Sequence, residues 1–532
     1  MTMTTSDEQA AVARELGVAS EQSGRRGVPG VAAARDRDGN PGVWRQAAGG
    51  VGDGVVSRRL SRTARISDGI PTGRLRRTAP VAGLVARTTG EAVVKAMRRK
   101  VTRSEVSVDY ERAAERYAQL LGRSKGALMK AGQALSFASL AASVPPEARV
   151  AYQRALSRLR EDAPPMDAAV ARGVLEAELG QSVQAAFAQF EPEPLAAASI
   201  GQVHRARLHD GRAVAVKIQY PGAAAAIDAD LANVELLSTF LSLLMSFSPR
   251  RIGVDNRAVA REIAEQIRAE LDYRREAANQ REFAGIYRGH PFIHVPEVVD
   301  ELSTERVLTQ ELVEGLTWEQ ARRAEVGLRE QWAHALLRFG QASINTFGIV
   351  NVDPHPGNYR FHGDGSVSFL DFGCVIRISP QTASHITRAL QAAFRGDVET
   401  TWKVSIEAGI WKQSDPVTPQ EAFDYWHEPL VMYWGPQPFR ITPEVVAAGI
   451  ERHNSPSGPS ANAVRYINSP EGYALMGRLD FGVLSVIADL DVALDWRALA
   501  LEFYENQPPS TEQSRLHWEF LATHHPSVKR HA

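Results

Sequence analysis

The sequence predicts an α+β protein with two lobes, on the basis of three observations. Apolar residues recur at i, i+3 and i+4 through much of 104–190, which is the spacing of an amphipathic helix. Two apolar segments, Ser199–Arg207 and Ala213–Ile218, flank a His-Asp-Gly turn, which is typical of a β-hairpin. Residues 376–532 return to a mostly helical pattern. The predicted order is therefore helices, a small β-rich unit with inserted helices, and a helical unit.

The part of the chain before this pattern divides in two. Residues 1–60 are rich in Gly, Ala, Arg and Asp and have no steady period, so we expect a disordered extension. Residues 61–103 form a basic arm, in which apolar residues from Val81 to Met97 recur at helical spacing beside arginine and lysine. A basic amphipathic helix of this kind can attach to an anionic membrane surface or pack on its own domain. Both alternatives stay open.

The remaining chain divides into three parts by pattern. We assign 104–190 to a helical segment, 191–315 to the small lobe with its inserted helices, and 316–532 to the second lobe with a helical C-terminal extension. Within them we expect helices at 227–247, 257–287 and 327–347, and strands at Val295–Val299, Arg306–Leu312 and Ser366–Leu370. Six tryptophans are expected to anchor the core of the second lobe: Trp402, Trp411, Trp426, Trp434, Trp496 and Trp518.

Charge and cysteine content exclude several classes of protein. The net charge is −1 over 532 residues, so the whole chain is not predicted to bind nucleic acid, although residues 1–103 hold 19 basic against 9 acidic side chains. A single cysteine, Cys374, excludes a disulfide framework and fits a reducing compartment. No secretory signal is visible in residues 1–20, and the longest apolar run, Leu236–Phe247, is too short to span a bilayer. We expect a cytoplasmic protein that can lie against the inner face of a membrane.

Two short segments carry the strongest chemical signal. Residues 350–358 read VNVDPHPGN and residues 369–375 read FLDFGCV, so that Asp353 precedes Asn358 by five residues and Asp371 opens a DFG. Protein kinases combine a catalytic-loop Asp and Asn with a later DFG at this spacing. Phosphoryl transfer requires cations held by hard oxygen ligands, which Asn358 and Asp371 would supply as ligands of Mg²⁺. Asp353 would orient or accept the proton of an attacking hydroxyl.

A lysine at the end of an apolar strand is the next candidate. Lys217 closes the sequence AVAVK and could grip the α- and β-phosphates of a nucleotide. The alternative is an edge-strand lysine that only promotes solubility. A buried lysine requires a carboxylate partner, and the predicted partner is Glu270, with Glu265 as the alternative.

The segment before the lysine strand occupies the position of a glycine-rich phosphate loop. Residues 196–203 read AAASIGQV, so alanine stands at the first two glycine positions and only Gly201 remains. Alanine costs about 1 kcal/mol or more where φ must be positive. We therefore expect this loop to hold phosphates differently from an ordinary kinase. The residues predicted to contact nucleotide here are Ala196, Ala197, Ala198, Ser199, Gly201 and Val203.

Together these motifs resemble the UbiB (aarF-type) family of atypical kinases. The resemblance rests on six motifs in order: the KxGQ of Lys130–Gln133, the alanine-rich Ala196–Ser199, the VAVK of Val214–Lys217, the ExD of Glu270–Asp272, the Asp353–Asn358 loop and the DFG of Asp371–Gly373. It covers about residues 104–376, and the sequence is most similar to the branch that contains mitochondrial coenzyme Q biosynthesis proteins. The resemblance implies a two-lobed protein-kinase-like fold that carries an added N-terminal helical KxGQ segment.

The resemblance also implies roles for individual residues. Lys217 would pair with Glu270 and contact phosphate of ATP or ADP, while Glu311, Leu312 and Val313 would line the adenine pocket at the hinge. Lys130 and Gln133 would lie over the active site, where a protein kinase receives its peptide, and this disfavours a protein substrate. The implied partners are anionic lipid, a prenyl-quinone precursor and other biosynthetic enzymes.

One departure from the family pattern concerns the catalytic loop. Asn351-Val352 stands where many members have His-Ala before the catalytic Asp, which could alter the support of the loop. Gly201 also stands where many members have another small residue, and could make the phosphate loop more supple. Two further side chains are expected to be structural, His355 as a loop-packing residue and Cys374 as a small core residue.

Three functions are compatible with these residues. The first is a Mg·ATP-dependent atypical kinase or ATPase that acts at a membrane in isoprenoid-quinone or lipid metabolism. The second is a non-catalytic binding protein that is gated by nucleotide through the KxGQ helix. The third is a small-molecule phosphotransferase of the antibiotic-kinase type, which would not be expected to combine KxGQ with ExD. The intact set of Asp353, Asn358 and Asp371 favours the first.

Overall fold

The computed structural model describes residues 166–198, 200–225, 227, 268, 270–453, 458–468 and 473–526. Its small lobe is built on a four-stranded antiparallel sheet in the order β1 (Gln189–Ala197), β2 (Gly201–Arg207), β3 (Ala213–Gln219) and β5 (Val307–Glu311). The predicted hairpin is confirmed as β2 and β3, in which Val203 lies opposite Lys217. The mixed helix and sheet content agrees with the predicted α+β class.

The first strand was not predicted from the sequence, which placed its first strand at Ser199–Arg207. β1 starts at Gln189, inside the segment 104–190 that was predicted to be helical, and it contains Pro192 and Pro194. Proline removes a donor from the ladder, so it is accepted only at a sheet edge or an irregularity. β1 is the edge strand of this sheet, and its register with β2 shifts on both sides of Pro194. The two prolines therefore make this strand difficult to recognise from the sequence, although the edge of the sheet accommodates them.

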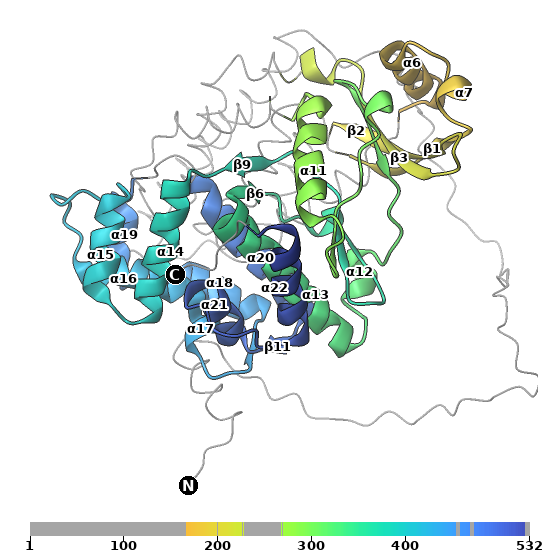
Figure 1. Ribbon diagram of the computed structural model, residues 1–532. Helices are drawn as coiled ribbons and strands as arrows, with labels where there is room; N and C mark the ends of the chain where they lie inside the picture. Colours follow the sequence, from red (N-terminus) through yellow and green to blue (C-terminus); the bar gives the residue numbers. More distant parts are fainter. Residues whose placement is uncertain are drawn as a thin grey trace, which may run out of the picture.

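Two short helices cover one face of this sheet. Helix α6 (Ala168–Leu179) is capped by Asp167 and ends at Gly180, whose φ of 65° lies in the left-handed region. Together with α7 (Val183–Ala186) it buries an apolar cluster against β2 and β3, which includes Leu175, Phe187, Val216 and Ile218. Figure 1 shows α6 and α7 on one side of the sheet and α11 (Tyr273–Tyr287) on the other.

Helix α11 is shorter than the predicted helix of 257–287. It begins at Tyr273, where the Asp272 carboxylate caps the backbone N–H of Arg274, and the preceding Glu270 and Leu271 form a turn. The part of the predicted helix before residue 268 lies outside the described residues. Hydrogen bonds that tie the helix to the rest of the small lobe include those from the Tyr273 N–H to the Glu305 carbonyl and from the Gln280 amide to the Pro296 carbonyl.

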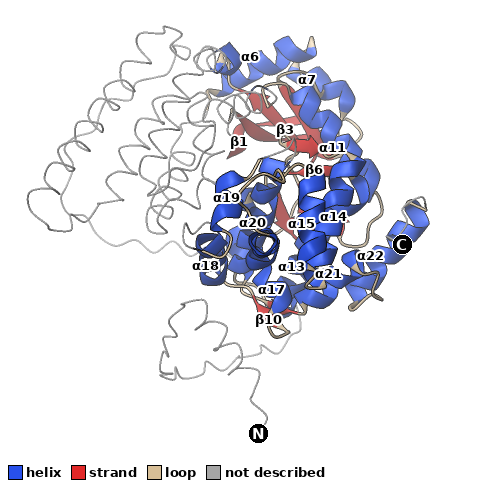
Figure 2. Ribbon diagram, turned by 90° about the vertical axis from the view of Figure 1, so that its left-hand side faces the viewer, coloured by secondary structure: helices blue, strands red, loops and turns tan. Residues whose placement is uncertain are grey.

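The second lobe is largely helical, as predicted. Its helices are α12 (Trp318–Ala321), α13 (Val326–Ala342), α14 (Pro380–Phe394), α15 (Val398–Glu407), α16 (Pro419–His427), α17 (Val431–Trp434), α18 (Pro443–His453), α19 (Ala461–Tyr466), α20 (Tyr473–Leu490), α21 (Trp496–Tyr504) and α22 (Glu512–His524). A π-helical turn at Ser343–Phe347 extends α13, so the predicted helix at 327–347 is confirmed. Figure 2 shows these helices gathered below the strands of the small lobe.

The short strands outside the small-lobe sheet form separate sheets in the orders β4-β8-β7, β6-β9 and β10-β11. They are β4 (Ile293–His294), β6 (Ile349–Asn351), β7 (Tyr359–Phe361), β8 (Val367–Phe369), β9 (Val375–Arg377), β10 (Phe439–Arg440) and β11 (Ala493–Leu494). β8 confirms the strand predicted at Ser366–Leu370, whereas only an isolated bridge at Val298 occupies the strand predicted at Val295–Val299. β6 pairs with β9, and this pairing brings together the two loops that follow β6 and β8.

The predicted tryptophan anchors are confirmed. Trp411 and Trp496 are almost fully buried, and the other four pack partly buried against apolar clusters. The same lobe also buries an ion pair, because Arg338 of α13 and Glu502 of α21 are both fully enclosed and bonded to each other. Glu502 additionally accepts hydrogen bonds from the Ser510 N–H, the Ser510 hydroxyl and the Trp518 indole. Among the described residues, no helix is both long enough and apolar enough to cross a bilayer.

Candidate nucleotide site

The centre of the candidate site is a lysine between two carboxylates. The Lys217 ammonium lies 2.8 and 2.9 Å from the two oxygens of Glu276 and 3.4 Å from Oδ2 of Asp371. The three side chains come from β3, from α11 and from the loop after β8, so the contact joins both lobes. Glu276 is 4% exposed, Lys217 16% and Asp371 32%, so the cluster is buried at Glu276 and opens towards solvent at Asp371.

The predicted partner of Lys217 was wrong. The sequence favoured Glu270, but Glu270 lies in the turn before α11, whereas Glu276 lies one turn inside that helix and faces β3. The reason is that α11 begins only after its cap at Asp272. Glu270 therefore lies outside the helix and not on the face that is turned towards Lys217. Glu270 itself lies close to the DFG turn, since its Cγ is 3.7 Å from the position of a β-carbon on Gly373. A catalytic role for Glu270 therefore stays a prediction. Glu265, the alternative partner, lies outside the described residues.

The environment keeps Lys217 charged. Burial alone would lower the pKa of Lys217, but the charges of Asp371 and Glu276 outweigh it and raise that pKa well above the usual value. The ammonium also lies over the ring of Tyr273, 4.9 Å from its centre. Lys217 is thus a mostly buried cation that is held between Glu276 and Asp371, and contact with phosphate stays a prediction.

The predicted catalytic loop lies beside this cluster. It follows β6 and contains the short 3₁₀ turn Pro356–Asn358. The Asn358 amide nitrogen donates to Oδ2 of Asp353 at 3.1 Å, and the Leu370 N–H donates to the Asn358 carbonyl at 2.9 Å. Because the nitrogen of the Asn358 amide is used inside the loop, its oxygen is the atom that could ligate a cation. Asp353, Asn358 and Asp371 therefore lie in one hydrogen-bonded unit.

Asn351, which stands where many family members have histidine, supports the catalytic loop. Its amide nitrogen donates to the Asp371 carbonyl at 2.7 Å, and its Oδ1 accepts the backbone N–H of Asp353 at 3.1 Å. The neighbouring Val352 is fully buried, and its N–H donates to the Cys374 carbonyl at 2.9 Å. One side chain thus links the catalytic loop to the DFG segment. The sequence showed Asn351 only as an unusual residue, because its two partners are 2 and 20 positions away.

The phenylalanine of the DFG holds the segment against α11. Phe372 is fully buried, and its ring lies 4.8 Å from that of Phe283, which in turn contacts Phe339 of α13. The Asn279 amide donates to the Phe372 carbonyl at 3.0 Å. Phe283 and Asn279 both lie on α11, the helix that carries Glu276. The position of that helix is therefore coupled to the orientation of Asp371.

Two side chains have the structural roles that the sequence predicted. Nδ1 of His355 accepts the backbone N–H of Gly357 at 3.0 Å and so caps the turn of the catalytic loop. Cys374 is 3% exposed and belongs to the main apolar core. Neither is placed as a metal ligand or as an accessible thiol.

The alanine-rich segment forms the end of β1 and a tight turn into β2. Ala196 and Ala197 are strand residues, and the Ala198 N–H donates to the Gly201 carbonyl at 2.9 Å. Ser199 lies outside the described residues. The sequence suggested that glycine at position 201 makes the loop supple, but the structure shows a steric requirement for it. A β-carbon at Gly201 would lie 2.2 Å from the carbonyl oxygen of Ile218. Glycine allows β2 to approach β3 beside Lys217. Contact between these residues and phosphate stays a prediction.

This close approach predicts that Gly201→Ala destabilises the small lobe by about 1–3 kcal/mol, because β2 must move away from β3. The shift is next to Lys217, so affinity for ATP should fall as well. Chemical denaturation and an ATP titration measure the two effects. Gly173→Ala in α6 is the matched control, since its added β-carbon meets nothing within 4 Å. Equal stability of wild type and Gly201→Ala would contradict the steric argument.

The predicted hinge residues follow β5. The N–H groups of Glu311 and Leu312 donate to the carbonyls of Glu297 and Ala213, respectively, so both are used in holding the hinge. The Glu311 carboxylate lies 3.4 Å from Nε2 of His294, and this hydrogen bond lowers the pKa of Glu311. Contact of Glu311, Leu312 and Val313 with an adenine base stays a prediction.

The donor set fits magnesium bound through a nucleotide. In the part of the chain that the structure describes, no three His, Cys, Asp or Glu side chains cluster as a metal site. Mg²⁺ commonly uses one or two carboxylates and completes its shell with water and phosphate oxygens, and here Asp371 offers one carboxylate and Asn358 an amide oxygen. Lys130 and Gln133, the predicted KxGQ residues, lie outside the described residues.

Comparisons with known proteins agree with this geometry. Residues 158–405 match the family described as ABC1 atypical kinase-like domain. The rat protein named atypical kinase COQ8B, mitochondrial, is 36% identical over 288 residues, which are 54% of this chain and 52% of that protein. The Arabidopsis thaliana protein ACTIVITY OF BC1 COMPLEX KINASE 8, chloroplastic, is 32% identical over 49% of this chain and 34% of its own length. The chain thus spans about half or less of these relatives.

A solved structure supports both fold and family. It is the complex of Rv3197 with erythromycin from Mycobacterium tuberculosis, and it matches with a TM-score of 0.51 and 31% sequence identity. The match covers 78% of this chain and 97% of that one. A kinase-like neighbour over this length confirms the predicted two-lobed, kinase-like class for the described residues. The chain belongs to the ABC1 atypical kinase-like family, also called the UbiB or aarF family.

Proposed function

We propose that this chain is a Mg·ATP-dependent atypical kinase or ATPase that acts at a membrane surface in isoprenoid-quinone or lipid metabolism. One observation carries the proposal: the cation of Lys217 and the carboxylate of Asp371 lie 3.4 Å apart. Asn351 links Asp371 to the loop of Asp353 and Asn358. A charged lysine, two oxygen ligands and a carboxylate base are the parts that phosphoryl transfer requires.

Each side chain would have one task in this reaction. Lys217 would bind the α- and β-phosphates, and Glu276 would hold the lysine in position. Asn358 and Asp371 would hold Mg²⁺, which neutralises charge on the phosphate oxygens when it is bound. Asp353 would orient the attacking hydroxyl or water and accept its proton, and the hydrogen bond from Asn358 would keep its carboxylate aimed.

The acceptor is proposed from the relatives and from the sequence. The atypical kinases named COQ8B are mitochondrial, and the sequence resemblance is to the branch that serves coenzyme Q biosynthesis. The basic arm at 61–103 would bring the protein to anionic lipid, and a prenyl-quinone precursor or a lipid would be the substrate. Other biosynthetic enzymes would be its protein partners.

A second function is favoured by one specific observation. The solved relative from M. tuberculosis contains erythromycin, a large and mostly apolar macrolide. The alternative is therefore a binding protein that takes up such a molecule under the control of ATP or ADP, without turnover. The alanines at the end of β1 and in the turn after it, where a kinase has glycines, are compatible with slow or absent hydrolysis.

Hydrolysis of ATP by the full chain separates the two functions. We expect Mg²⁺-dependent hydrolysis that rises with vesicles containing anionic lipid and that falls at least about 10²-fold in Asp371→Asn, because the variant loses the charged metal ligand. Vesicles of neutral lipid are the control for the surface effect. No turnover above the variant under either condition, with nucleotide binding intact, would overturn the enzymatic proposal and leave the gated binding protein.

A further inference from the structure

Helix α20 carries a glycine that faces the catalytic loop. A β-carbon on Gly482 would lie 2.2 Å from Cγ of Pro354, 3.3 Å from its Cβ and 3.4 Å from its Cδ. Real β-carbons do not approach a ring atom to 2.2 Å, so only a hydrogen fits between the helix and the proline. Pro354 is buried and directly follows Asp353, the predicted catalytic aspartate.

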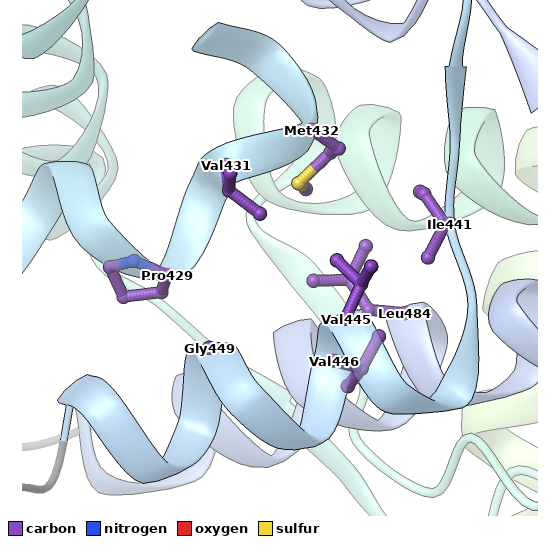
Figure 3. A pocket seen from close by; sticks show the side chains of 8 residues that line it. All are labelled: Pro429, Val431, Met432, Ile441, Val445, Val446, Gly449 and Leu484. Carbon is purple, nitrogen blue, oxygen red and sulfur yellow. The ribbon is translucent and has the colours of Figure 1, made fainter. Parts of the chain in front are cut away.

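The helix itself has little freedom to move away. Its C-terminal half buries Leu484, Val486, Ile487 and Leu490 in the main apolar core, where it packs along α13 and α18. Leu484 follows Gly482 by two residues, about 200° around the helix, and so points away from the loop. Figure 3 shows Leu484 beside Val445 and Val446 of α18, where these side chains line an apolar pocket.

A glycine inside a helix requires a reason. Glycine costs about 1 kcal/mol relative to alanine at an interior helical position. Gly449 of α18 shows the contrast, because a β-carbon there would meet nothing within 4 Å. At Gly482 the absent side chain is what permits the contact with Pro354.

The loop would transmit a shift of Pro354 to the reacting groups. The His355 N–H donates to the Asp353 carbonyl at 2.7 Å, and the Asn358 N–H donates to the His355 carbonyl at 2.9 Å. These bonds make the segment from Asp353 to Asn358 one tight turn. Displacing the proline ring therefore displaces the Asp353 backbone and, through the turn, the Asn358 side chain.

We propose that Gly482 is a positioning residue for the predicted catalytic loop. The close packing of Pro354 against Gly482 would let α20 fix the positions of Asp353 and Asn358. The C-terminal extension is then part of the catalytic apparatus rather than only a stabilising layer. This inference rests on the proposed enzymatic function for its effect on turnover, but the contact itself can be measured without turnover.

The first test compares three variants of the full chain. Gly482→Ala is expected to lower kcat for ATP hydrolysis about tenfold or more, because small misplacements of reacting groups reduce rates strongly. The KM for ATP should change less than kcat, since Lys217 is held by Glu276 of α11 and by Asp371, and neither lies on α20. Gly449→Ala should match wild type. In the Pro354→Ala background the clashing ring atom is gone, so Gly482→Ala should then lower kcat by no more than about threefold.

The second test is hydrogen exchange of residues 349–361 without nucleotide. Gly482→Ala should exchange faster than wild type and Gly449→Ala in this segment, and the double variant should exchange like Pro354→Ala alone. If the wild type has no ATPase activity but Gly482→Ala still exchanges faster than wild type, the proposed function is wrong and the positioning role stands. Unchanged exchange together with unchanged kcat would overturn the inference. If Gly482→Ala does not fold, the double variant with Pro354→Ala decides the question. Failure of the double variant to fold as well would overturn the inference, because the clash with Pro354 would then not be the cause of the misfolding.

Discussion

Replacement of Glu276 by glutamine is expected to lower the free energy of unfolding by about 3 kcal/mol and to reduce ATP turnover at least about 10²-fold. Breaking a buried ion pair from one side leaves an uncompensated charge, which costs about 3–5 kcal/mol. Here the Lys217 ammonium would keep one carboxylate partner, Asp371 at 3.4 Å, beside its contact with the Tyr273 ring. Because the pKa of Lys217 is raised above its usual value, the lysine keeps its charge at neutral pH and loses it only as the pH rises through the folded-state pKa, so assays at neutral pH measure the full effect of the pair.

The matched control for this change lies on the same helix. Glu282 pairs with Arg377, but both side chains are about half exposed, and exposed pairs contribute about 0–1 kcal/mol. Denaturant titration of Glu276→Gln and Glu282→Gln therefore compares a buried and an exposed carboxylate of α11. Equal stability of the two variants, with unchanged turnover, would show that Glu276 does not hold Lys217 in solution.

The second large effect is expected far from the nucleotide site. Glu502→Gln should destabilise the second lobe by about 3–5 kcal/mol, because it leaves the fully buried Arg338 cation without its carboxylate. Three buried histidines share this region, and burial lowers the pKa of each, so they are neutral and offer no negative charge that could replace the Glu502 carboxylate. Glutamine keeps the shape and acceptor oxygen of the side chain, so the change tests charge rather than packing.

An exposed pair on α22 provides the control for this second prediction. Glu512 bonds Arg515 at the surface of the same lobe, and Glu512→Gln is expected to change the unfolding free energy by less than about 1 kcal/mol. Thermal unfolding of both variants measures the difference. A melting temperature of Glu502→Gln equal to that of the control would contradict the conclusion that the buried ion pair between Arg338 of α13 and Glu502 of α21 stabilises the lobe.

Sequence reasoning found the parts of the site that lie close together in the chain. Asp353, Asn358 and Asp371 belong to short motifs whose spacing carries their meaning, and Lys217 ends a recognisable strand. The hairpin of β2 and β3 was predictable for the same reason, since its signal is local. The family resemblance added the two-lobed arrangement, which no single motif specifies.

The parts that were missed depend on contacts between distant segments. Glu276 could not be chosen over Glu270, because the choice depends on where Asp272 starts α11. Gly201 and Gly482 were not recognisable as close-approach positions, since the atoms they make room for belong to Ile218 and Pro354. β1 was obscured by two prolines that only an edge strand tolerates. Tertiary packing decides each of these cases.

Equilibrium binding of ATP tests the central claim most directly, because it requires no acceptor and no membrane. ATP would be titrated into the full chain with Mg²⁺ and with a chelator, for wild type and for Asp371→Asn. We expect wild type to bind at least about tenfold more tightly with Mg²⁺, equivalent to about 1.4 kcal/mol, and the variant to lose this difference. Absence of binding to wild type, or an undiminished effect of Mg²⁺ in Asp371→Asn, would contradict a magnesium–nucleotide site at Lys217 and Asp371.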